Sequence, residues 1–151
     1  MKRNIAAAFY WFAAITITLG AYGHGFVGVK PVRAAIAAST LAPDVVRVIW
    51  IVWYFVSGCM VTFGILLFWA WPAIKAGSSS RSSVALIIGA FYTVTGIASY
   101  LYSGREPFWL LFVTQGVVVI GSTLVLRAQL PNGARRRGAS SGASIRGARD
   151  P

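Results

Sequence analysis

The sequence predicts an all-α integral membrane protein, a four-helix bundle with up-down topology and both termini in the cytoplasm. Hydrophobic residues make up 57% of the 151 residues and charged residues only 11%, with a mean hydropathy of +0.69. These values lie outside the range of ordinary soluble domains. In addition, four apolar runs are each long enough for a helix to cross a hydrocarbon core.

The four runs cover about residues 5–28, 45–71, 84–102 and 108–126. Because lipid offers no partner to an unpaired backbone amide, each run is predicted to be a helix. Residues 1–126 therefore form one predicted transmembrane domain.

Polar and helix-breaking residues separate the runs. Asp44 is placed to cap the second helix, and Pro72 is predicted to end it because proline cannot continue the hydrogen-bond ladder. The stretch 77–83, GSSSRSS, is predicted to be a flexible loop. The stretch 31–44 is apolar but too short to span, so we expect an interfacial or re-entrant helix over the outer opening, with a plain surface loop as the alternative.

The distribution of Lys and Arg predicts the orientation. One side carries ten of them, namely Lys2, Arg3, Lys75, Arg81 and six arginines from Arg127 to Arg149, whereas the other carries Lys30, Arg33, Arg47 and Arg105. The positive-inside rule places the first group in the cytoplasm of a bacterial cell, so the protein is a predicted multi-pass inner-membrane protein. As an alternative, residues 1–23 resemble a secretory signal peptide, but the run is long and aromatic for that role.

The tail 127–151 is rich in Gly, Ala, Ser and Arg and lacks apolar residues to bury, so it is predicted to be disordered and cytoplasmic. Its charges either retain the tail inside the cell or contact anionic lipid headgroups through Arg135, Arg136 and Arg137. The net charge of +11 does not indicate nucleic acid, because the apolar runs are too long to face water.

No Asp, Glu, Lys or Arg lies well inside a run. This argues against a proton-coupled exporter of the small multidrug-resistance type, which needs an intramembrane carboxylate. The single histidine, His24, and the single cysteine, Cys59, cannot form a metal cluster or a disulfide. We expect no cofactor, no metal and no nucleic-acid partner.

Four polar residues without a permanent charge remain as the candidate ligand-binding site: His24, Tyr54, Ser99 and Gln115. At a rise of 1.5 Å per residue, all four fall in the outer half of the predicted bundle. The alternative is that these residues, with stripes such as Gly89, Tyr92, Thr93, Gly96 and Ser99, serve only helix–helix packing.

In outline the chain resembles small, uncharacterised four-helix bacterial membrane proteins. The resemblance rests on Gly23-His24-Gly25 with Gly28 at the end of the first helix, and on the Trp- and Ser-bearing stretch from Trp53 to Ser57. It implies no activity and no catalytic residues.

The sequence thus favours a non-enzymatic accessory or helix-association protein whose partners are membrane lipids and either another membrane protein or further copies of itself. The alternative function is a binder or carrier of a lipid or quinone in an outer-half cavity. A membrane enzyme using His24 ranks third, because no partner acid or base is evident.

Overall fold

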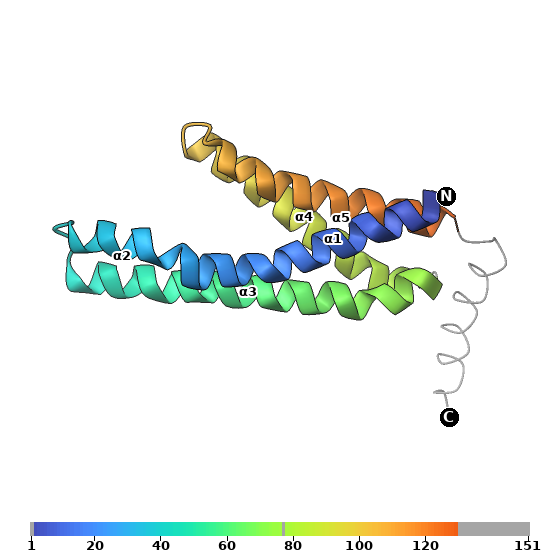
Figure 1. Ribbon diagram of the computed structural model, residues 1–151, viewed down its shortest axis with the longest axis horizontal. Helices are drawn as coiled ribbons and strands as arrows, with labels where there is room; N and C mark the ends of the chain where they lie inside the picture. The colour runs from blue at the N-terminus through green and yellow to red at the C-terminus, as the bar shows by residue number, and fades with distance from the viewer. Residues whose placement is uncertain (1, 77, 130–151) are drawn as a thin grey trace, which may run out of the picture. The chain divides into compact units, whose positions relative to one another are not determined.

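The computed structural model describes residues 2–76 and 78–129, and every regular element within them is a helix. The elements follow the chain as α1 (Lys2–Tyr22), the π-helical turn η1 (Gly23–Val27), α2 (Val29–Ala37), α3 (Pro43–Ala76), α4 (Ser79–Tyr102), the 3-10 turn η2 (Pro107–Trp109) and α5 (Leu110–Ala128) (Figure 1). The tail beyond residue 129, with Arg135, Arg136 and Arg137, lies outside the described residues.

Four helical stretches of the described chain are long and apolar enough to cross a membrane: Arg3–Ala37, Pro43–Ala76, Arg81–Tyr102 and Pro107–Ala128. Only 17 to 33% of the residues in their apolar windows are buried inside the protein. Exposure of so many large apolar side chains to water, such as that of Phe55, which is 69% exposed, would be unfavourable. The predicted all-helical class and the four candidate spans are confirmed, as expected of a multi-pass membrane protein.

The predicted interfacial or re-entrant element at 31–44 has other bounds in the structure, where α2 covers Val29–Ala37; its position at a membrane interface stays a prediction. The first helix continues through η1 into α2 and ends only at Ala37. Pro31 does not break it, because this residue lies in the first turn of α2, where a missing amide costs little. α2 lies beside the first turns of α3 (Figure 1), and the Arg33 guanidinium lies 5.8 Å from the centroid of the Trp50 ring.

The second predicted helix also has different ends. α3 begins at Pro43, so Asp44 belongs to its first turn and does not cap it, and Pro72 lies inside the helix. The 34 residues of α3 span about 51 Å at 1.5 Å per residue, whereas a hydrocarbon core is about 30 Å thick. A helix of this length tilts or extends beyond the hydrocarbon, and the exposed Asp44–Arg47 ion pair, at 3.3 Å, marks its charged first turn.

The contacts divide the chain into two compact units. Residues 14–65 form the hairpin unit, made of the end of α1, η1, α2 and the first two thirds of α3. Of the described residues, 2–13, 66–76 and 78–129 form the terminal unit, which contains the start of α1, the end of α3, α4 and α5.

In the hairpin unit, small residues bring α1 and α3 close together. A Cβ atom at Gly64 would collide with the Thr18 side chain, and one at Gly20 would lie 2.7 Å from the terminal methyl of Met60. The Thr18 hydroxyl donates to the carbonyl of Ala14 at 2.8 Å, so its hydrogen bond is satisfied within its own helix at this crossing. The close approach is the kind that glycine allows between helices in lipid.

In the terminal unit, aromatic side chains join the start of α1 to the end of α3. The buried Tyr10 hydroxyl donates to the carbonyl of Leu67 at 2.7 Å. The Tyr10 and Trp71 rings stack with centroids 5.4 Å apart, and Trp11 meets Phe68 and Trp71 at 5.5 and 5.4 Å.

α4 and α5 pack through glycines. A Cβ at Gly116 would lie 2.5 Å from the carbonyl oxygen of Gly89 and 2.6 Å from the amide nitrogen of Thr93, and one at Gly96 would lie 2.8 Å from the amide of Val113. The predicted packing role of Gly89, Thr93 and Gly96 is therefore confirmed.

Candidate functional site

The π-helical turn η1 surrounds the single histidine. In an α-helix the amide of Gly28 would donate to the carbonyl of His24, four residues earlier. Here the Gly28 amide donates instead to the carbonyl of Gly23 at 2.8 Å. The turn therefore leaves the His24 carbonyl available to a partner outside its own helix. Single π-turns of this kind occur frequently at functional sites.

Trp53 of α3 supplies that partner. Its indole Nε1 donates to the His24 carbonyl at 3.1 Å. The same indole stacks on the His24 imidazole with centroids 4.0 Å apart and an interplanar angle of 18°. One side chain thus holds both the main chain and the ring of His24.

The His24 ring also contacts Ser57, one turn further along α3. His24 Nδ1 lies 2.9 Å from Ser57 Oγ, and the Ser57 hydroxyl lies within donating distance, 3.2 Å, of the carbonyl of Trp53. Either neutral tautomer satisfies this contact, because Nδ1 can donate to the serine oxygen or accept its proton. His24 therefore hydrogen-bonds a polar group of another candidate span. We call these three residues, His24, Trp53 and Ser57, the histidine clasp.

The glycines beside His24 have a steric reason. A Cβ at Gly25 would lie 3.3 Å from Ser57 Oγ, and one at Gly28 would lie 3.2 Å from both Trp53 Cζ2 and the His24 carbonyl oxygen. Gly23 has open space around its Cβ position. Close approach to α3 therefore accounts for Gly25 and Gly28 but not for Gly23.

The clasp brings a hydroxyl next to an imidazole, which is the pairing of a nucleophile with a base. The acid of the hairpin unit, Asp44, does not extend it into a triad. Asp44 pairs with Arg47 and precedes Trp53 by about 14 Å along α3 at 1.5 Å per residue. Among the described residues, no group of three His, Cys, Asp or Glu side chains could hold a metal ion. The contacts are those of a clasp that joins η1 to α3.

The remaining predicted site residues lie in different surroundings. Tyr54 belongs to the hairpin unit, is 52% exposed and stacks on Trp50 with centroids 6.2 Å apart. Ser99 and Gln115 are half-buried residues of α4 and α5, in the terminal unit. The convergence of these three residues with His24 on one ligand stays a prediction.

Sequence reasoning did not identify Trp53 and Ser57 as the partners of His24. Their spacing of four residues, which places both on one face of a helix, was the available signal. No protein-family model, curated protein or solved structure matches this chain. Its function therefore has to be inferred from its own contacts.

Proposed function

We propose that this chain is a non-enzymatic multi-pass membrane protein that works by helix–helix association, as an accessory subunit of a membrane complex or as a homo-oligomer. In this proposal its four spans form an up-down bundle in a bacterial inner membrane, with both termini in the cytoplasm. The observation that carries the association is an exposed glycine on α3, Gly58, for which the described chain provides no partner.

The glycines of the spans show why Gly58 is informative. At Gly20, Gly25, Gly28, Gly64, Gly89, Gly96 and Gly116, an added Cβ would lie within 3.4 Å of an atom of another residue. Gly58 is exposed and has nothing within 4 Å of its Cβ position. Glycine in a helix interior lowers stability relative to alanine, so a use in packing is expected.

Thr62 extends the same face by one turn. It is exposed, and its hydroxyl donates to the carbonyl of Gly58 at 2.9 Å, so it presents a small surface with no unsatisfied donor. Two small residues four positions apart form the pattern through which helices associate in lipid. Gly58 and Thr62 lie on a face of α3 that points away from its crossing with α1 at Gly64, so this face is open to a partner.

Replacing Gly58 by phenylalanine should therefore weaken association without unfolding the chain, because the ring enters open space. We expect the fraction of associated chains in native membranes to correspond to a dissociation constant at least about tenfold higher, equivalent to about 1.4 kcal/mol. Cross-linking in the membrane, followed by measurement of complex size, gives this fraction. The matched control is Val52→Phe, which adds an aromatic ring at an exposed position of the same helix that lies about 120° around the helix axis from Gly58. A wild-type chain that is always alone, or an equal effect of both variants, would contradict the proposal.

The orientation follows from the charges at the helix ends. Arg3, Lys75, Arg81 and Arg127 stand at the ends proposed to be cytoplasmic, and Lys30, Arg33, Arg47 and Arg105 at the others. A cytoplasm-specific reporter fused after Pro151 should be active, since Lys- and Arg-rich ends are retained inside. Activity of a periplasm-specific reporter at the same position would mean that the first run is cleaved or that one span is absent.

A further inference from the structure

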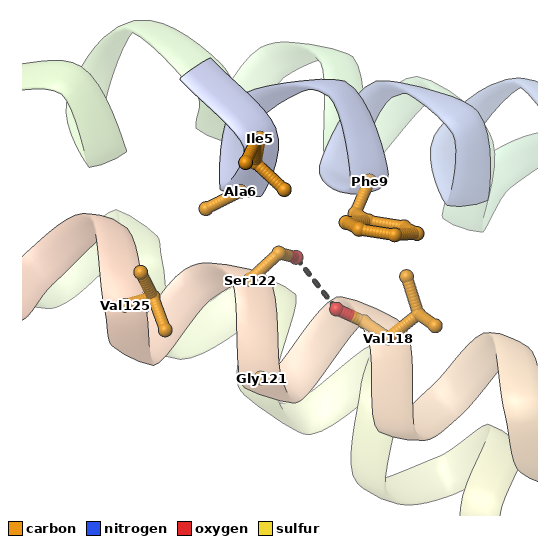
Figure 2. A pocket seen from close by; sticks show the side chains of 7 residues that line it. All are labelled: Ile5, Ala6, Phe9, Val118, Gly121, Ser122 and Val125. Carbon is orange, nitrogen blue, oxygen red and sulfur yellow. Dashed lines mark hydrogen bonds between the residues drawn. The ribbon is translucent and has the colours of Figure 1, made fainter. Parts of the chain in front are cut away.

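A groove runs between α1 and α5 in the terminal unit. Its cavity volume is about 410 Å³, within the range of sites for small ligands. Ile5 and Phe9 of α1 line one side, and Val118, Gly121, Ser122 and Val125 of α5 line the other (Figure 2). None of the residues of the histidine clasp lines it.

The groove offers almost no polar group to a ligand. Its one hydroxyl, on Ser122, donates to the carbonyl of Val118 at 2.6 Å and is therefore already satisfied (Figure 2). Gly121 is exposed, with nothing within 4 Å of its Cβ position, so its missing side chain leaves part of the space. Both helices belong to candidate membrane spans, so the groove opens to hydrocarbon and suits an elongated apolar chain.

Positive charge stands at one end of this groove. Arg3 stands two residues before Ile5 in α1. The end of α3 reaches the same level, because Tyr10 and Trp11 pair with Trp71, and its last turn carries Lys75. The described acid of this unit, Glu106, precedes η2 at the opposite end of α5. Charge and shape together match an apolar tail with an anionic head.

We propose that this groove is a binding site for an anionic phospholipid, with an acyl chain between α1 and α5 and the headgroup at Arg3. An acyl chain that moves from the bilayer into the groove exchanges one apolar environment for another, so the hydrophobic effect adds no affinity. Selectivity for one lipid therefore comes from packing and from the headgroup. The site is independent of the association proposed for Gly58, which belongs to the other unit.

A helix of a second copy fits the groove less well. Helices in lipid approach one another through small residues on both sides. Here the edge contributed by α1 carries the large side chains of Ile5 and Phe9, which are 49% and 54% exposed. A flexible acyl chain can pass beside these side chains.

The test uses the full chain in bilayer discs that contain equal amounts of phosphatidylglycerol and phosphatidylcholine. Native mass spectrometry of the released protein should show one phosphatidylglycerol retained in preference to phosphatidylcholine. Gly121→Phe should reduce this retention about tenfold, whereas Leu124→Phe, at an exposed position of α5 outside the groove, should leave it unchanged. Replacing Arg3 by glutamine should lower the preference for phosphatidylglycerol by about fivefold.

A measurement on the wild-type chain makes the test independent of how the variants fold. Phosphatidylglycerol with a photoreactive acyl chain should label the peptides that contain Phe9 and Val118. Labelling spread evenly over the four spans, or retention unchanged in Gly121→Phe, would overturn the proposal. So would an efficient disulfide between two copies carrying Gly121→Cys in a Cys59→Ala background, because a second copy would then occupy the groove.

Discussion

Replacing Gly116 by alanine should destabilise the chain by about 3 kcal/mol, at the upper end of the usual cost of overpacking. The added methyl would lie 2.5 Å from the carbonyl oxygen of Gly89 and 2.6 Å from the amide nitrogen of Thr93, both backbone atoms of α4. Backbone atoms inside a helix cannot turn aside as a flexible side chain can. α4 and α5 would therefore have to separate along the crossing. Thermal unfolding in detergent, followed by near-ultraviolet circular dichroism, measures the loss.

Gly121→Ala is the matched control for this result. Gly121 lies on the same helix and gains the same methyl, but nothing lies within 4 Å of its Cβ position. Alanine is otherwise the better helix former, by up to about 1 kcal/mol, so this variant should be neutral or slightly stabilised. Equal destabilisation of both variants would show that the α4–α5 crossing does not depend on close backbone contact.

The four spans could be predicted from sequence because lipid sets a simple requirement of length and apolarity, which α3 meets from Val48 to Ile74 without a charged side chain. The ends were less predictable. Pro31 and Pro72 suggest helix ends, but a proline removes only one backbone hydrogen bond, which the first turn of α2 does not need and which α3 tolerates near its last turn. Hydropathy gives no signal for this distinction.

The candidate site was only partly predictable, for two physical reasons. The π-turn places one additional residue in the helix. This rotates the position of His24 around the helix axis by about 100° relative to an uninterrupted α-helix. Which residue of α3 it meets therefore depends on that turn, and the contact is with Ser57, not with Tyr54 one turn earlier. In addition, residues such as Ser99 and Gln115 lie on helices whose outward faces are as apolar as their inward faces, so periodicity does not identify the buried side.

The histidine clasp gives the second large effect, because Trp53 makes two of its contacts. Trp53→Leu should lower the free energy of unfolding by about 2 to 3 kcal/mol, through loss of the ring stack on His24 and of a hydrogen bond to a carbonyl that η1 leaves without a partner in its own helix. Trp53→Phe keeps a stacking ring but lacks the indole N–H, and should cost about half as much. Thermal unfolding in detergent gives both values.

A second half-buried tryptophan in the same segment, Trp50, separates the clasp from a general loss of aromatic surface. Trp50 stacks on Tyr54, lies 5.8 Å from the Arg33 guanidinium and makes no described contact with His24. Trp50→Leu should therefore cost about 1 kcal/mol, the range of one aromatic pair and an exposed cation–π contact. If Trp50→Leu and Trp53→Leu destabilise the chain equally, the carbonyl released by the π-turn contributes nothing. If Trp53→Phe is as harmful as Trp53→Leu, the hydrogen bond and not the stack holds η1 against α3, because a ring without an N–H would then be no better than no ring.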